Sequence, residues 1–223
     1  MLILGQKQIN TDGNVDIWSG QVYRPMPEPS QCIIRSTSDL DSSDGAGCQV
    51  ASISGLIAWD QPEVTEYVEL NGTRPASTSG RFVAVNAVHC ERFGSLATNA
   101  GRLTVISSTD GVHQAAVSAA TGRSTDAVYA IPEGQQLTIT SAQATLKASS
   151  PQYRADVSLM VQRRPEGSTG GWQLLAWVND SLSVTVAGPA SIKAVCDYIS
   201  QPMGICCVTI NGELSNANES QAS

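Results

Sequence analysis

The fold is decided by the stretch Cys32–Val85, which reads CIIRSTSDLDSSDGAGCQVASISGLIAWDQPEVTEYVELNGTRPASTSGRFVAV. Short runs of alternating apolar residues are separated there by Gly, Asp, Ser and Pro, and a Leu70-Asn71-Gly72 turn closes the second half. This pattern is typical of antiparallel strands joined by tight turns, and it leaves no room for long helices. The stretch therefore predicts an all-β protein.

The same pattern continues along the rest of the chain. Pro132-Glu133-Gly134-Gln135 predicts a β-turn, with proline where its fixed φ helps. Residues 113–123 are rich in alanine, but the turn residues around them favour a strand followed by a loop. Turns about every 8–12 residues indicate a β-sandwich or jelly roll. The predicted strands cover residues 31–37, 49–59, 63–70, 81–91, 102–107, 112–118, 127–131, 136–148, 154–164, 172–178, 183–186, 191–199 and 205–212.

We expect three parts in the chain. Residues 1–30 contain a turn-rich patch and the proline-rich segment RPMPEPS, which predict an extended N-terminal arm. Residues 31–214 predict one β-sandwich domain, or two packed sub-sandwiches divided near residues 95–112. Residues 215–223 are polar and predict a C-terminal tail.

The charge balance argues against a nucleic-acid partner. The chain has 13 Lys plus Arg against 20 Asp plus Glu, a net charge of −7 and a pI of about 4.7, whereas nucleic-acid binding needs a cationic face. Residues 1–10 lack the cationic head and cleavage site of a secretory signal. No apolar run reaches the roughly 18 residues that span a bilayer. We therefore expect no nucleic acid and no membrane as partners, and assembly in the cytoplasm.

Six cysteines occur without a CxxC spacing: Cys32, Cys48, Cys90, Cys196, Cys206 and Cys207. Neighbouring residues of a strand point to opposite faces, so the adjacent Cys206 and Cys207 are not expected to bond to each other. We expect free, buried thiols that behave as small apolar groups rather than a disulfide framework. Zinc is less favoured still, because structural zinc usually takes paired ligands two to four residues apart.

Asp39-x-Asp41-x-Ser43 superficially resembles a calcium-binding loop. The helix–loop–helix type needs Gly at the sixth position and Glu at the twelfth, and here those positions hold Asp44 and Val50. We expect a solvated turn rather than that type of site. A shell-type calcium site in a β loop stays open at this point.

Nothing in the sequence forms a recognisable reaction centre. His89 and His113 are the only histidines, and Cys90, which follows His89 directly, should face away from it on a strand. No nucleophile elbow, zinc-protease motif or phosphate loop occurs. Catalysis by two carboxylates, as in glycoside hydrolysis, stays open. We therefore expect a protein that is not an enzyme, with no catalytic, cofactor-binding or metal-binding residues and no cofactor.

Segments spread over most of the chain, in the same order, resemble a family of β-rich virion structural proteins from tailed bacteriophages. Two features depart from the family: the high cysteine content, and residues 182–199, which lack an expected charged loop. The matching segments are GNVDIWSGQVY at 13–23, SDLDSSDGAGCQVASISGL at 38–56, WDQPEVTEYVELNGTRP at 59–75, GRLTVISSTDG at 101–111, AVYAIPEGQQLTIT at 127–140 and MVQRRPEG at 160–167.

The resemblance implies a structural role in the phage particle, as a head decoration or cement protein or as a tail-associated or fibre protein. The leading expectation is a capsid decoration protein, a homotrimer in the virion that binds and stabilises the major capsid protein lattice through residues 1–30. The alternative is a tail-associated protein that binds host-surface glycan through exposed Trp and Tyr side chains. Trp172 and Trp177 lie five residues apart, so on a regular strand we expect them on opposite faces, with one in the core. A third hypothesis is a carbohydrate-active enzyme.

Overall fold

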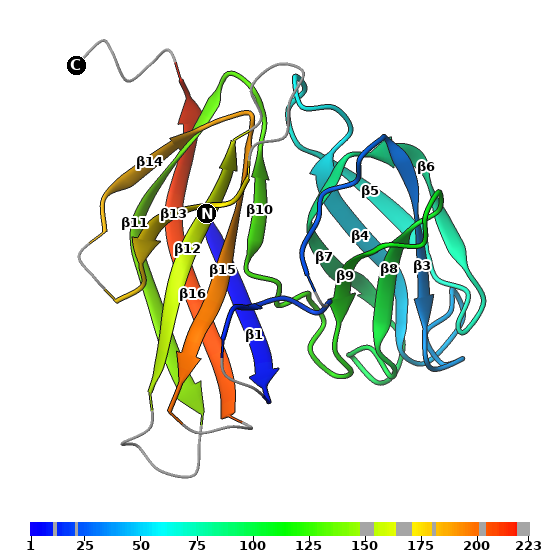
Figure 1. The fold of residues 1–223 in the computed structure, drawn as a ribbon. Coiled ribbons are helices and arrows are strands. Elements are labelled where there is room, and N and C mark those ends of the chain that lie inside the picture. The colour runs from blue at the N-terminus through cyan, green and yellow to red at the C-terminus, as the bar shows by residue number, and fades with distance from the viewer. Residues whose placement is uncertain are drawn as a thin grey trace. The chain divides into compact units, whose positions relative to one another are not determined.

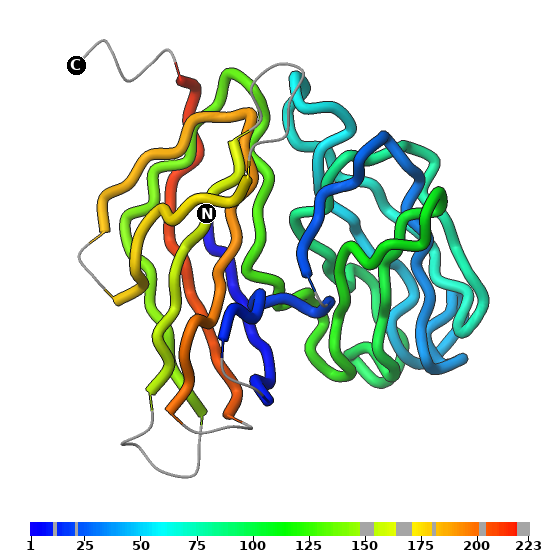
Figure 2. Tube along the Cα trace, viewed as in Figure 1, coloured from blue at the N-terminus to red at the C-terminus, as the bar shows by residue number. Residues whose placement is uncertain are grey.

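The computed structural model describes residues 1–10, 13–20, 22–147, 154–163, 171–179, 182–200 and 204–217. These residues form sixteen strands and no helix, so the predicted all-β class is confirmed (Figure 1). The chain divides into two compact units. Unit 1 comprises Met1–Tyr23 together with Thr125–Ser223, and unit 2 comprises Arg24–Ser124. Unit 2 is thus inserted into the sequence of unit 1, and both ends of the colour scale fall in unit 1 (Figure 2).

Unit 1 is a sandwich of two antiparallel sheets. One sheet has the strand order β1-β16-β11-β14, and the other has the order β10-β15-β12-β13, with β2 also paired to β15. The strands are β1 (Leu2–Ile9), β2 (Val15–Asp16), β10 (Val128–Ile131), β11 (Gln135–Lys147), β12 (Ala155–Arg163), β13 (Gln173–Trp177), β14 (Val184–Ala187), β15 (Ala190–Ile199) and β16 (Gly204–Asn216).

The strands of unit 1 pair as one long hairpin would if it were folded over on itself. Apart from the short β2, the first strand β1 pairs with the last strand β16, and β10 pairs with β15. In the same way β11 pairs with β14, and β12 pairs with β13. The β1–β16 ladder runs from Leu2 opposite Asn211 to Ile9 opposite Gly204, so strands from the two ends of the described chain lie side by side.

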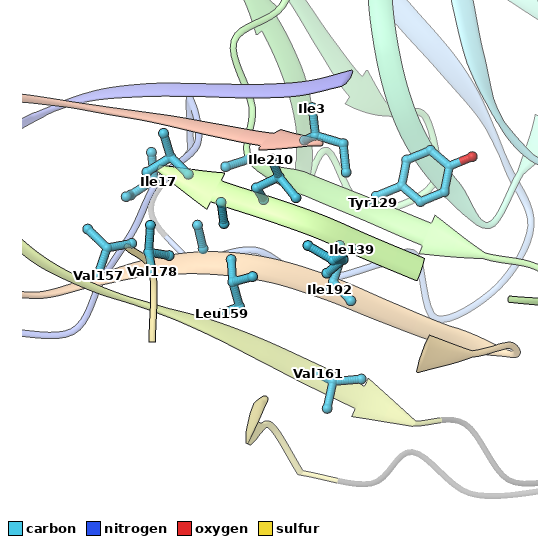
Figure 3. Close-up of a cluster of buried hydrophobic side chains, with 14 of the residues drawn as sticks. Ile3, Ile17, Tyr129, Ile139, Val157, Leu159, Val161, Val178, Ile192 and Ile210 are labelled. Carbon is cyan, nitrogen blue, oxygen red and sulfur yellow. The ribbon is translucent and has the colours of Figure 1, made fainter. Parts of the chain in front are cut away.

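The core of unit 1 is built from alternate residues of both sheets. Val157, Leu159 and Val161 of β12 are buried in one apolar cluster with Ile139 of β11 and Ile210 of β16, which belong to the other sheet (Figure 3). Strand residues with even spacing point to the same face. This alternation is therefore what turns the sequence pattern into two packed layers.

Unit 2 is a smaller pair of antiparallel sheets with the orders β6-β3-β8-β9 and β5-β4-β7. Its core contains Ile34, Ile53, Phe82 and Val105. The Glu66 carboxylate of β5 accepts hydrogen bonds from the backbone N–H groups of Ser79 and Gly80 in β6, so it joins the two sheets along one side. The strands are β3 (Ser30–Ser36), β4 (Cys48–Leu56), β5 (Val64–Glu69), β6 (Ala76–Phe82), β7 (Ala84–Phe93), β8 (Leu103–Ser107) and β9 (His113–Val117).

The prediction of an extended N-terminal arm over residues 1–30 is wrong. Strand β1 is hydrogen-bonded to β16 along its whole length, and Ile3, Ile9 and Ile17 lie in the core of unit 1. Met26 lies in the core of unit 2 instead, and its N–H donates to the carbonyl of Val83 at 2.9 Å. Burying one isoleucine side chain stabilises a protein by about 2 kcal/mol. An arm extended into solvent would lack this stabilisation for each of its isoleucines.

The predicted internal boundary and tail also differ from the structure. The boundary expected near residues 95–112 falls inside unit 2, where β8 is an inner strand of its sheet. The boundaries between units lie instead at residues 23–24 and 124–125. The tail expected at 215–223 begins within β16, because Ser215 pairs with Gln136. Residues 218–223 lie outside the described residues.

Candidate binding surface

A β-bulge in β13 decides which of its side chains reach solvent. Ala176 lies opposite Leu159, whose side chain is in the core, and Trp177 lies opposite Ser158. The register then shifts by one residue at Leu175, so that Leu174 lies opposite Met160. Ser158 and Met160 alternate along β12 with core residues, so their side chains lie on the outer face of the sheet. Residues that lie opposite each other across an antiparallel ladder share a face. Leu174 and Trp177 therefore both point away from the core.

The prediction that Trp172 and Trp177 face opposite sides is wrong, because both lie outside the core between the two sheets. Trp172 is nevertheless partly buried, since it packs against a smaller cluster formed by Trp18, Tyr23 and Val128. Trp177 is 46% exposed, and the Trp172 ring lies over the ammonium of Lys193, with Nζ 4.5 Å from the ring centroid. The bulge at Leu175 adds one residue between the two tryptophans. A bulge residue shifts the alternation of a strand, which is why five residues of separation leave both side chains outside the core.

Four apolar side chains form one surface on this outer face, called here the β13 surface: Met160, Leu174, Trp177 and Tyr198. Leu174 is 53% exposed and Tyr198 is 44% exposed. Tyr198 reaches this face because β15 also has a bulge: Cys196 lies opposite Val157 and Tyr198 lies opposite Asp156, which leaves Asp197 as the extra residue. β13 is the last strand in the order of its sheet, and no described strand pairs with its other side. The β13 surface therefore combines exposed apolar side chains with an open strand edge.

A buried ion pair lies on the same face of the sheet. Lys193 Nζ donates to Asp16 Oδ1 at 2.7 Å, and both side chains are more than nine-tenths buried. The second oxygen of Asp16 accepts the N–H of Tyr23 at 2.7 Å. Tyr23 in turn packs against Trp18, with ring centroids 5.2 Å apart, and against Trp172 at 6.2 Å. No sequence pattern indicates this pair, because its two charges are brought together by the pairing of β2 with β15.

Lys7 and Asp126 also hold polar groups of this segment in place. The Lys7 ammonium donates to the carbonyl of Gly20, and Asp126 Oδ1 accepts the N–H of Ser19 at 2.6 Å. Burial lowers the pKa of Lys7, and the neighbouring carboxylates of Asp16 and Asp126 oppose that shift. These contacts fix the chain between β2 and the start of unit 2, so we assign them a structural role.

The acidic loop of unit 2 is held by Asp41, which the structure buries completely. Its Oδ1 accepts the N–H groups of Cys48 and Ala100, each at 2.8 Å. Its Oδ2 accepts the Ser36 hydroxyl at 2.6 Å and the Gly101 N–H at 2.8 Å. The expectation of a solvated turn is therefore wrong for Asp41. Because its oxygens are occupied by donors of the protein, they are unsuited to ligating calcium.

Asp39 remains at the surface of the same loop and is bonded to Thr73. Its Oδ1 accepts the Thr73 hydroxyl at 2.6 Å and the Thr73 N–H at 3.2 Å. These hydrogen bonds lower the pKa of Asp39. Within the described part of the chain, no group of three or more His, Cys, Asp or Glu residues could hold a metal ion.

His89 does not form a nucleophilic centre with Cys90 or Ser52 in the described structure. His89 is exposed on β7 while Cys90 is buried, which confirms that the two side chains face apart. Ser52 lies opposite His89 across the sheet, but its hydroxyl donates to Glu91 Oε1 at 2.6 Å. A hydroxyl committed to a carboxylate in this way is not aligned for proton transfer to imidazole.

Comparisons with protein-family models, with curated proteins and with solved structures found no match to this chain. In the described residues, no helix has the length and apolar character needed to cross a bilayer. The candidate site of unit 1 is the β13 surface, whose exposed apolar side chains and open strand edge are suited to binding.

Proposed function

We propose that this chain is a non-catalytic structural protein of a tailed-phage virion, and that it decorates the capsid by binding the assembled lattice of the major capsid protein. The sequence segments that resemble phage virion proteins motivate the proposal. The pairing of first strand with last in unit 1 supports a jelly roll, an architecture that viral capsid domains and lectins use.

The β13 surface is the observation that carries a binding role. Apolar patches that stay open on a folded protein mark sites of interaction, and an open strand edge offers backbone groups to a partner strand. Leu174 and Trp177 provide both features on one strand. This surface replaces the N-terminal arm as the proposed contact, because residues 2–9 are already paired within unit 1.

Decoration stabilises a shell by mass action. A protein that binds the assembled lattice but not its free subunits stabilises the assembled state, by an amount that rises with its concentration relative to its Kd. We propose that the decorating form is a homotrimer and that it joins capsids in the host cytoplasm. The net charge of −7 gives no attraction to the packaged DNA.

Cosedimentation with empty capsids tests the proposal. The double variant Leu174→Glu/Trp177→Glu should abolish capsid binding, because it places two charges on the β13 surface. Tyr67→Glu is the matched control: Tyr67 is 66% exposed on β5 of unit 2 and should bind as the unmodified protein does. Circular dichroism and urea unfolding verify that both variants fold. Equal capsid binding by the double variant and the control contradicts the proposal.

Glycan binding is the second candidate, and a specific observation favours it. Trp177 and Tyr198 are exposed aromatic side chains, and the exposed Asp156 lies directly opposite Tyr198. Aromatic faces with polar neighbours suit sugar rings. If this is the function, purified protein binds host cells but not empty capsids, and Trp177→Ala removes the cell binding.

A further inference from the structure

Lys193 and Asp16 form a buried contact that the backbone around it holds in place. Lys193 Nζ lies 2.7 Å from Asp16 Oδ1, and the two side chains are only 8% and 5% exposed. Asp16 is paired with Val195 in the β2–β15 ladder. The next N–H of the chain, that of Ile17, donates to the carbonyl of Ala194 at 2.9 Å. Strand pairing therefore fixes the amine-bearing and the carboxyl-bearing side chain against each other.

Aromatic rings enclose this contact. The Trp172 ring lies over the Lys193 side chain, with Nζ 4.5 Å from the ring centroid. Trp172 packs in turn against the buried cluster of Trp18, Tyr23 and Val128. The backbone of the same cluster reaches the carboxylate, because the Tyr23 N–H donates to its Oδ2 at 2.7 Å. Water therefore has little access to the two groups.

We propose that Lys193 and Asp16 condense to an intramolecular isopeptide bond, which makes their contact a site of covalent self-modification. A proton passes from Nζ to Oδ1 across the hydrogen bond, which gives an amine and a carboxylic acid. Nζ then attacks Cγ, and Oδ1 leaves as water after taking a second proton from Nζ. One Nζ–Cγ bond forms and one Cγ–Oδ1 bond breaks, without any oxidant, reductant or other reactant. This proposal does not depend on the proposed function.

The geometry favours each part of this reaction. A nitrogen 2.7 Å from one carboxyl oxygen lies about 3.5 Å from the carboxyl carbon, which is the separation of a near-attack arrangement. Attack on Cγ places negative charge on Oδ2, where the Tyr23 N–H already donates a hydrogen bond. Burial penalises the charged forms of both groups, so it lowers the cost of the proton transfer that precedes the attack.

Confinement also favours the amide over the two separate groups. Groups that are held in contact react as if they were present at an effective concentration of about 10⁵–10⁸ M. The water that is released passes to bulk solvent. The aromatic cluster then hinders the return of water that hydrolysis of the bond requires.

The bond joins residues that are 177 positions apart in the sequence. It links β2 to β15 and encloses all of unit 2 in a covalent ring. A cross-link that closes a long loop removes conformational entropy from the unfolded chain. The bond therefore stabilises unit 1 against unfolding.

The test is the intact mass of the full chain, measured in denaturant after purification and during incubation of the folded protein at neutral pH. A fraction of the molecules that rises with time should be lighter than the sequence by one water molecule. In a tryptic digest, the peptide that contains Asp16 should be joined to the peptide that contains Lys193. Trypsin should not cleave after Lys193 in the joined peptides, because the ammonium that it recognises has become an amide.

Variants identify the reacting groups. Lys193→Arg keeps the positive charge but removes the amine, so it should retain the full mass of its sequence. Asp16→Asn should give the same joined peptides with loss of ammonia instead of water. Lys147→Arg is the control, because it replaces an exposed lysine at the end of β11 and should still lose one water molecule.

Two outcomes would overturn the proposal. One is a chain that is folded by circular dichroism and keeps the full mass of its sequence throughout the incubation. The other is loss of water without joined peptides, since a succinimide at Asp44-Gly45 or Asp110-Gly111 causes the same change in mass. Both outcomes are read on the chain without substitutions, so poor folding of a variant does not affect the conclusion.

Discussion

Replacement of Asp41 by asparagine should strongly destabilise unit 2. The carboxylate accepts four hydrogen bonds, two on each oxygen. An amide keeps one oxygen and places an NH₂ group where the other oxygen was. Two buried donors then lose their acceptor and face another donor instead.

The magnitude follows from those two donors. A buried donor without a partner costs about 1–3 kcal/mol, so Asp41→Asn should lower the free energy of unfolding by roughly 2–6 kcal/mol. A domain of this size has a total stability of about 5–15 kcal/mol. The variant should therefore be close to the limit of folding at physiological temperature.

The assay is urea unfolding followed by hydrogen exchange with mass spectrometry, which reports the two units separately. Peptides that contain the amides of Cys48, Ala100 and Gly101 should lose protection at lower urea in Asp41→Asn. Asp44→Asn is the matched control in the same loop, because Asp44 is exposed and accepts a hydrogen bond from the Ser42 hydroxyl at 3.2 Å. If Asp41→Asn unfolds within about 1 kcal/mol of the control, Asp41 does not organise the loop as the buried-donor argument requires.

Three other perturbations test the remaining features. Lys193→Met should lower the free energy of unfolding of unit 1 by about 3–5 kcal/mol, because it leaves the Asp16 carboxylate buried without its cation. Adding Asp16→Asn to this variant should recover part of the lost stability in urea unfolding, and no recovery would contradict the ion-pair explanation. Residues 24–124 expressed alone should give a β-type circular dichroism spectrum and one cooperative thermal transition, whereas an unfolded fragment would show that unit 2 depends on unit 1. Thr73→Val should raise the pKa of Asp39 toward its usual value, measured by NMR titration, because valine lacks the hydroxyl whose hydrogen bond favours the charged carboxylate. A lowered pKa stabilises the fold above the unfolded-state pKa, and this stabilisation is lost as pH falls through the folded-state pKa. The variant should therefore lose less stability in acid, and an unchanged pKa would refute the assignment.

Local strands could be predicted from the sequence because alternation is a local signal. The strand expected at residues 63–70 is β5 at Val64–Glu69, and the strand expected at 136–148 is β11 at Gln135–Lys147. The sequence does not predict strand β6, because its residues ASTSGRF are mostly small and polar and show little apolar alternation. The sequence predicts an arm where β1 lies, because its partner β16 is about 200 residues further along the chain and no nearby residue indicates the pairing.

The candidate site was harder to predict than the strands, for two physical reasons. A single bulge residue such as Leu175 reverses the faces of all later side chains in a strand, and it has no distinctive sequence. A buried carboxylate such as Asp41 is recognised by its donors, and Ala100 and Gly101 come from a distant loop. The division of the chain into two nested units depends likewise on long-range pairing, so the strand pattern alone could not locate its boundaries.

The insertion of unit 2 between β2 and β10 sets an order of events on the ribosome. All strands of unit 2 have been synthesised once residue 124 has emerged, so this unit can fold early in translation. Strand β1 precedes unit 2 in the chain, whereas its partner β16 follows unit 2. Contacts so distant in sequence form slowly. Until they form, the apolar side chains of β1 lack their partner strand, although the inserted unit 2 has all of its own strands.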